Sequence, residues 1–249
     1  MRITGKWIVP VLLAALLALP SMVSAQTISD ECASCHNEQF QQWKASGHPY
    51  KLMKGDIAQN RPIPLPEGYT WDEISYVIGG YKWKSRYMDK DGYIITEGKG
   101  DVPGNTQYNM LTGEWVDYHA DDPNGTRPYN CGSCHTTGWV ANDNPDDTSG
   151  NQDGLAGIWG TFEEPGISCE QCHGAGARHV STQSADDITV DSSDELCGSC
   201  HNRGGLNTTI PASGGLPNTF IRHHEQYNEW QNSAHSAGDP TNAGCNDCH

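Results

Sequence analysis

The chain has 249 residues, of which only three are Phe while 28 are Gly and 14 are Pro. Because large apolar side chains are few, they make a poor hydrophobic core, and we expect another group to organise the interior. The formal net charge of −16 argues against binding to nucleic acid or to anionic membranes, and the length allows one domain or two small ones.

Residues 1–25 have the pattern of a signal peptide. Arg2 and Lys6 form a short positive region, and the apolar run at 9–19 is too short to span a bilayer. Small residues at 23–25 offer a cleavage site, so we expect a mature chain that begins at Gln26. Losing Arg2 and Lys6 would change the formal charge from −16 to −18. No later segment of the sequence is long or apolar enough to cross a membrane.

All ten Cys fall in one pattern, Cys-x-x-Cys-His, which occurs five times. Residues three apart share one face of a helical turn, so both thiols can reach the two vinyl groups of one porphyrin while the adjacent His reaches the iron. Disulfides need no His after each second Cys, and zinc sites would use the Cys pairs in twos. We therefore predict five covalently bound haems c. The attaching residues are Cys32 and Cys35, Cys131 and Cys134, Cys169 and Cys172, Cys197 and Cys200, and Cys245 and Cys248, and the proximal ligands are His36, His135, His173, His201 and His249.

Two His ligands on every iron require five further His, and the sequence holds six candidates. His179 follows His173 by six residues, too close to reach the far side of the same haem, so we expect it to serve a neighbouring haem. The three Met of the mature chain stand in no ligand context, and we expect them to be packing residues. The distal candidates are His48, His119, His179, His223, His224 and His235.

Residues 36–48 and 223–235 share the frame His-x-Glu-Gln-aromatic-x-x-Trp-x-x-Ser-small-His, which is an internal repeat. The aromatic residue and the Trp are three apart, which predicts a helix with an apolar stripe that packs on a haem. In this frame His223 occupies the place of a proximal ligand, so we prefer it to His224 and leave the choice open.

The gap between the first and second motifs is the longest. Thr70 and Glu73 form a capping box, which predicts a short helix that Gly79 and Gly80 end. Runs rich in aromatic and β-branched residues then predict a β-meander insertion over about 82–118. Its strands are expected at 82–88, 93–96, 107–110 and 114–118, with turns at 89–92 and 111–113.

The later gaps are shorter. Residues 142–154 are acidic and rich in Asn and Gly, and their spacing favours a solvated loop over a calcium site. Ser192 and Glu195 predict a helix that carries the fourth motif and ends at 204–205, followed by a loop over 206–219. The expected fold class is a multihaem cytochrome, with short α-helices and coil wrapped around a chain of haems and little regular secondary structure.

Segments 76–87, 129–138 and 166–174 and the frame at 223–235 resemble multihaem cytochromes of the c-prime/c-five-fifty-four class. Within that class they are most similar to outer-surface cytochromes that polymerise into extracellular haem nanowires, although those relatives carry four haems. The resemblance implies a secreted or cell-surface homopolymer in which a His of one subunit can ligate a haem of the next. We expect His48 in that role, with His119 as second choice. The sequence stops at His249, so it is either a fragment or leaves the last haem open to another subunit.

Two-His ligation leaves no open position for a substrate, so we predict an electron carrier rather than an enzyme. Its partners would be redox proteins or extracellular acceptors. A multihaem reductase of small nitrogen compounds would need an open site, which pentahaem nitrite reductases mark with a Lys in place of the motif His, and all five motifs here end in His. A periplasmic shuttle or a porin-docked module remains the alternative.

Overall fold

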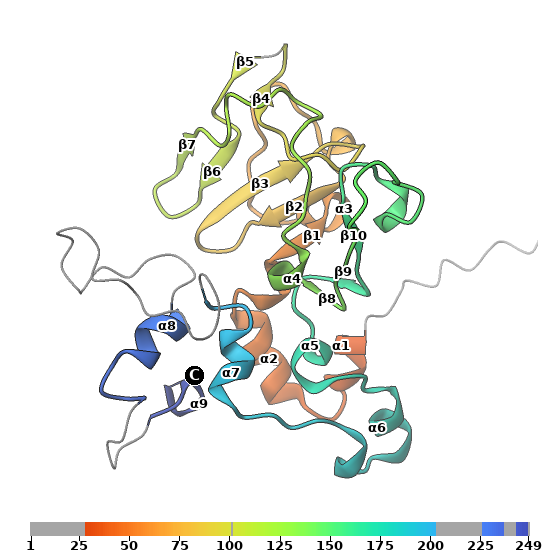
Figure 1. Ribbon diagram of the computed structural model, residues 1–249, viewed down its shortest axis with the longest axis vertical. Coiled ribbons are helices and arrows are strands. Elements are labelled where there is room, and N and C mark those ends of the chain that lie inside the picture. Colours follow the sequence, from red (N-terminus) through yellow and green to blue (C-terminus); the bar gives the residue numbers. More distant parts are fainter. Residues whose placement is uncertain (1–27, 101, 203–225, 237–242, 249) are drawn as a thin grey trace, which may run out of the picture.

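A computed structural model describes residues 28–100, 102–202, 226–236 and 243–248 of the chain (Figure 1). The predicted signal peptide, the loop at 206–219 and the candidate ligands His223, His224 and His249 lie outside these residues. Among the described residues, no helix has both the length and the apolar character needed to cross a membrane.

A five-stranded antiparallel sheet occupies the upper part of the molecule in Figure 1, in the order β1-β2-β3-β6-β7. The strands pair in chain order, so the sheet is a meander with long connections from β1 to β2 and from β3 to β6. Its strands are β1 (Leu52–Lys54), β2 (Tyr76–Gly79), β3 (Lys84–Met88), β6 (Gln107–Asn109) and β7 (Glu114–Val116).

The two faces of this sheet carry two separate hydrophobic clusters. Leu52 belongs to one cluster and Met53 to the other, as expected when successive strand residues point to opposite faces. The first cluster comprises Leu52, Tyr76, Ile78, Met88, Ile94, Tyr129, Ile158 and Phe162. The second comprises Met53, Ala58, Ile63, Ile74, Val77, Tyr87 and Ile95. Both clusters therefore lie within residues 52–162. Met88 and Met53 belong to them, and Met110 packs against the second.

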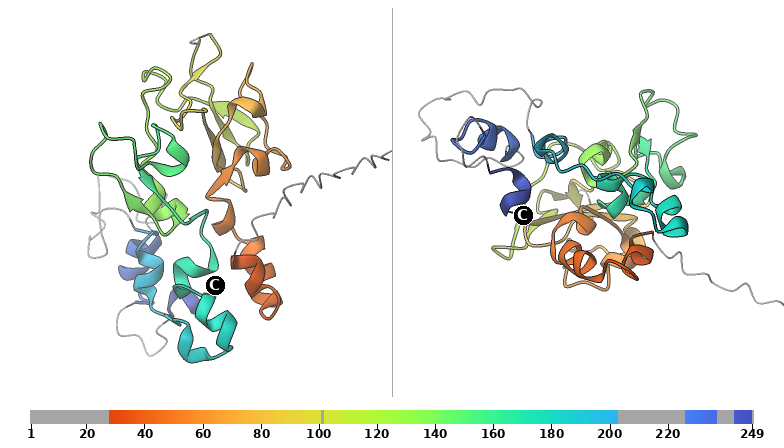
Figure 2. Two further views of the ribbon diagram at one scale, coloured as in Figure 1. Left: turned by 90° about the vertical axis from the view of Figure 1, so that its right-hand side faces the viewer. Right: turned by 90° about the horizontal axis from the view of Figure 1, so that it is seen from below.

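Most of the helices gather below the sheet in Figure 1 and in the left view of Figure 2, where the orange N-terminal part meets the teal and blue C-terminal parts. They are α1 (Ile28–Cys32), α2 (Asn37–Ala45), α4 (Gly132–His135), α5 (Cys169–His173), α6 (Ala177–Thr182), α7 (Asp194–Gly198), α8 (Gln226–Gln231) and α9 (Cys245–Cys248). Helix α3 (Gly55–Ala58) lies beside the sheet. Short 3-10 turns are η1 (His48–Tyr50), η2 (Trp71–Glu73), η3 (Gln152–Gly154) and η4 (Ala185–Asp187).

Three small two-stranded pairs complete the described structure: β4 with β5, β8 with β11, and β9 with β10. Their bounds are β4 (Glu97–Gly98), β5 (Val102–Pro103), β8 (Thr136–Thr137), β9 (Val140–Ala141), β10 (Gly160–Thr161) and β11 (Glu164–Pro165). The predicted combination of short helices with a small antiparallel sheet is thus confirmed.

Several local predictions need correction. The capping box forms, since the Thr70 amide donates to Glu73 Oε2 at 2.9 Å, but it starts only the 3-10 turn η2. The expected helix up to 79 is wrong, because residues 76–79 form β2, whose side chains are needed in both clusters. Residues 93–96 form no strand, and only Ile94 makes a bridge, to Met88.

The other meander strands are present but shorter than predicted, and β1 and β2 extend the sheet upstream of residue 82. The helix of the fourth motif is capped by Ser193 rather than Ser192, because the Ser193 hydroxyl accepts from the Leu196 amide. Residues 142–154 form a turn-rich loop held by Asn142, whose side-chain amide donates to Asp147 O and Asn151 Oδ1, both at 2.7 Å.

Candidate haem centres

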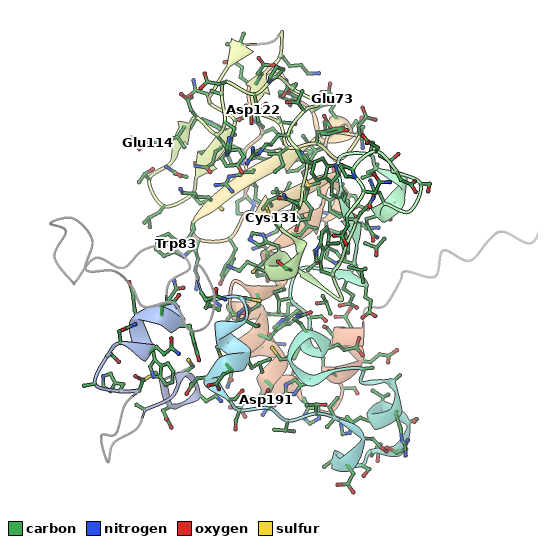
Figure 3. All side chains as sticks on the ribbon, in the orientation of Figure 1. Glu73, Trp83, Glu114, Asp122, Cys131 and Asp191 are labelled. Carbon is green, nitrogen blue, oxygen red and sulfur yellow. The ribbon has the colours of Figure 1, made fainter. Side chains whose placement is uncertain are left out.

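The two Cys of each Cys-x-x-Cys-His motif lie on a single helical turn. Helix α5 contains the whole third motif, and α4 contains all of the second except Cys131, its N-cap residue. The backbone bonds from His36 to Cys32 O at 2.8 Å and from His201 to Cys197 O at 3.0 Å form the same turn in the first and fourth motifs. All ten Cys are free of disulfides, and Cys131 lies where the sheet region meets the helices (Figure 3). Each turn therefore offers two thiols on one face.

Backbone carbonyls orient several of the candidate imidazoles. The Nδ1 atoms of His135, His173 and His179 lie 3.1, 3.0 and 2.8 Å from the carbonyl oxygens of Lys51, Thr189 and Ser184. Because a carbonyl only accepts, each Nδ1 must carry the proton, which leaves Nε2 unprotonated in the neutral ring. This is the arrangement by which proteins hold a metal-binding His in one tautomer and one orientation.

Two pairs of imidazoles face each other at a distance suited to one metal ion. The ring centres of His36 and His179 are 6.1 Å apart with an interplanar angle of 27°, and those of His48 and His201 are 6.2 Å apart at 81°. Two metal–nitrogen bonds of about 2.0 Å each, with the offset from each nitrogen to its ring centre, require a separation of about 6 Å. Each pair joins a motif His to a distal candidate from elsewhere in the chain.

Electrostatics within the second pair agree with neutral ligands. Burial lowers the pKa of His48, and the facing His201 lowers it further. A protonated imidazole could not offer its nitrogen to a metal ion. The His48 ring is therefore kept in the form that can bind.

Thiols of different motifs contact one another and show which motifs are neighbours. Burial raises the pKa of Cys32 to about 11, and the thiol of Cys169 in the third motif also contributes. Hydrogen bonding from Cys200 lowers the pKa of Cys134 to about 6, and the pKa of Cys200 rises because the two share that bond. The first motif thus adjoins the third, and the second adjoins the fourth.

The fourth motif also adjoins the fifth. Burial raises the pKa of Cys245 to about 12, with contributions from a hydrogen bond to Asp194 and from Cys197. The Cys245 amide donates to Asp194 Oδ1 at 2.5 Å, which holds α9 against the start of α7. The five motifs therefore form one connected group.

The helices that carry the motifs hold few buried apolar side chains of their own. Among the described residues outside 52–162, the buried hydrophobic ones are Phe40, Ile167 and Tyr227. Such helices need a large apolar group between them to stay packed, and five porphyrins would supply it. Together with the paired thiols and imidazoles, this deficit means that the residues present fit covalently bound haem. No three or more His, Cys, Asp or Glu side chains gather as a metal cluster in the described part of the chain.

The internal repeat predicted from the sequence is also a repeat in space. The rings of Phe40 and Trp43 are 5.4 Å apart, and those of Tyr227 and Trp230 are 5.6 Å apart. The Ser that follows each Trp donates to the Trp carbonyl at 2.7 Å in both copies. Helices α2 and α8 are therefore equivalent elements.

Each copy also holds a second motif in the same way. The Trp43 indole donates to Ile167 O at 2.8 Å, and the Trp230 indole donates to Ala243 O at 2.8 Å. Each acceptor stands two residues before the first Cys of a motif, the third and the fifth. We call residues 32–48 with 167–173 the first copy, and residues 197–201, 226–235 and 243–248 the second copy.

The start of each copy is a proximal ligand. The Phe40 amide donates to His36 O at 2.9 Å, and the Tyr227 amide donates to His201 O at 2.9 Å. His201 thus occupies in the second copy the place that His36 occupies in the first. In the sequence frame at 223–235, His223 holds this first position. The preference for His223 over His224 itself falls outside the described residues.

The remaining distal candidates are placed differently. His119 is exposed in the sheet region, has a φ of 50°, and lies 3.4 Å from Asp122 Oδ2. The structure does not bring it together with a motif His among the described residues. His235 is exposed after α8 and its amide donates to Ser233 Oγ at 3.2 Å, just as His48 does to Ser46 Oγ.

His48, which we expected to reach an adjacent subunit, faces a motif His of its own chain, His201. The carbonyl acceptors at Lys51, Ser184 and Thr189 were not found from the sequence. Every residue has a carbonyl, so no residue type marks this role.

No family model and no curated protein matches the sequence. Among solved structures, the chain is similar in fold to the undecahaem cytochrome from the S-layer of Carboxydothermus ferrireducens, with 22% identity, a TM-score of 0.49, and coverage of 73% of this chain and 26% of the other. It is also similar to the outer cell wall cytochrome OcwA, with 22% identity, a TM-score of 0.48, and coverage of 69% and 36%. This chain thus spans about a quarter and about a third of those two proteins. With TM-scores below 0.5, neither likeness decides the function.

Proposed function

We propose that this protein carries electrons through five covalently attached haems, each ligated by two His side chains. The observation that carries the proposal is the two pairs of facing imidazoles, with ring centres 6.1 and 6.2 Å apart, each pair including a motif His. Haem iron with two axial His takes up and gives back one electron without an open coordination position. This supports an electron carrier rather than a reductase.

The chain's own residues have three roles in this function. The thiols hold each porphyrin covalently, and the carbonyls of Lys51, Ser184 and Thr189 fix the rings of their His partners. Contacts between motifs keep neighbouring centres close, as between Cys134 and Cys200. Rigid ligands at short separations limit the rearrangement that accompanies each change of charge.

Haem content and spin state test this proposal. Denatured protein in alkaline pyridine should give five haems per chain, none extractable with acid acetone, and the oxidised protein should be wholly low-spin. The reduced protein should not bind carbon monoxide readily. Substantial high-spin iron in the complete, wild-type assembly would instead support an enzyme with an open site.

A second proposal concerns assembly into an extracellular filament. His48 of the first copy faces His201, the leading motif His of the second copy. His235 has the equivalent position in the second copy, so it would likewise serve a haem of another copy, one other than that of His36, which already faces His179. A head-to-tail contact with another subunit provides such a haem, and a contact of that kind propagates without closing. This assigns to His235 the bridging role first expected for His48.

Electron microscopy of the secreted material tests the filament. His235→Ala should give monomers with one high-spin haem, whereas filaments that form normally with every haem low-spin would rule out His235. His119→Ala is the matched control, and if it gives the monomers instead, His119 is the bridge. Wild-type protein that stays monomeric at high concentration with five low-spin haems would replace the filament by the periplasmic shuttle or porin-docked module.

A further inference from the structure

One short segment, from His48 to Leu52, touches two candidate haem centres. Its first residue faces His201 of the fourth motif. Three residues later, the Lys51 carbonyl accepts from His135 Nδ1 of the second motif at 3.1 Å and from the Gly79 amide at 2.9 Å. The turn η1 therefore ties the second and fourth motifs to the edge of the sheet.

The side chain of Lys51 lies between the same two motifs. Its ammonium folds back toward Gly47: a Cβ atom at Gly47, as any other residue would have there, would lie 3.9 Å from Lys51 Nζ. Lys51 is half-buried. Burial lowers the pKa of Lys51, while Cys134 and Cys200 oppose that shift, so the ammonium is near one thiol of each motif. The contact between Cys134 and Cys200 places the two attachment points side by side.

The other motifs have a different charge environment. Carboxylates approach the first and fifth motifs, where Glu170 acts on Cys32 and Asp194 Oδ1 accepts from the Cys245 amide. The second motif has further cations, because Arg86 and Arg127 both act on Cys131. Positive charge is thus concentrated around the second motif in a chain whose net charge is −16.

We propose that Lys51 is an electrostatic control residue that raises the reduction potentials of the second and fourth haems above those of the others. The inference rests on the proposed function, since it needs haem at both motifs. Reduction adds one electron to a ferric iron and lowers the charge of the site by one, without breaking a bond. A fixed positive charge nearby stabilises the reduced form, most strongly where water is excluded. Electrons entering the protein would therefore collect on this pair.

Potentiometric titration of the fully loaded protein, followed by visible and electron paramagnetic resonance spectra, tests the proposal. Lys51→Met removes the charge but keeps the backbone carbonyl, and it should shift two of the five components to more negative potential while haem content stays at five. Lys51→Arg should restore the wild-type curve. Lys90→Met is the matched control, since Lys90 is exposed beyond the far end of β3, and it should change nothing.

The signal of the fourth centre makes the result specific. Its imidazole planes are 81° apart, whereas those of the first centre are 27° apart, so the two ferric signals differ in shape. In Lys51→Met the signal of the fourth centre should persist to lower potential than in wild type, and the signal of the first centre should not move. Unchanged potentials in a variant with five low-spin haems would overturn the role of Lys51 alone. Missing or high-spin haem in the wild-type protein would instead overturn the proposed function.

Discussion

Removing one distal ligand should change one fifth of the haem iron and leave the rest as it was. His179→Ala deletes the imidazole that faces His36 at 6.1 Å, while the Cys pair and the proximal ligand of that centre stay intact. With five motifs in the chain, we expect one haem in five, about 20% of the iron, to become high-spin and to bind carbon monoxide. The other four centres keep both ligands.

The shape of the lost signal identifies the centre. When two imidazole planes are nearly parallel, both interact with the same iron d orbital and split the orbital pair widely, whereas perpendicular planes leave the pair nearly degenerate. His179→Ala should therefore remove the signal expected for the 27° pair, and His48→Ala should remove that of the 81° pair. Electron paramagnetic resonance of the oxidised protein, integrated against total haem, measures both losses.

A matched control separates ligand loss from damage to the helix. Ser181 lies on α6 with His179, is exposed, and among the described residues its hydroxyl donates only to the local Arg178 O, so Ser181→Ala should keep five low-spin haems. The pairing would be refuted if His179→Ala stayed wholly low-spin with five haems bound. It would also be refuted if His179→Ala and His48→Ala removed the same signal.

Three further predictions concern stability. Leu52→Ala, at a fully buried site in the first hydrophobic cluster, should lower the free energy of unfolding by about 2–5 kcal/mol in chemical denaturation, and a loss below about 1 kcal/mol would contradict its place in the core. Tyr76→Phe removes the 2.5 Å hydrogen bond to Asp153 Oδ2 and should cost about 1.5–3 kcal/mol in the same assay, whereas a neutral effect would show that the bond is not formed. The hydrogen bond from Lys99 lowers the pKa of Glu73. The bond therefore stabilises the fold above the unfolded pKa of the carboxyl, and this stabilisation is lost as the pH falls through the lower folded pKa. The free energy of unfolding measured against pH should lose this acid component in Lys99→Ala, and an unchanged profile would contradict the prediction.

Local chemistry was largely predictable from the sequence. Both thiols and the proximal His of a motif lie within five consecutive residues, so their spacing alone defines one helical turn that can hold a porphyrin. The repeat at 36–48 and 223–235 was readable for the same reason, and helices α2 and α8 show the predicted aromatic stripe. The prediction failed at 70–79, where the local capping signal was correct but burial of Tyr76, Val77 and Ile78 in the sheet outweighed it.

The partners of the motif residues depended on tertiary structure. Nothing near His48 in the sequence indicates that it faces His201, because segments far apart along the chain bring the two rings together. The same is true of the Lys51 carbonyl and ammonium, which reach two motifs only when η1 lies between them. The sequence by itself determined the number and position of the Cys-x-x-Cys-His motifs, since each motif needs only neighbouring residues. The tertiary structure decided which imidazoles can share an iron and which charges surround each centre, since both depend on packing across the whole fold.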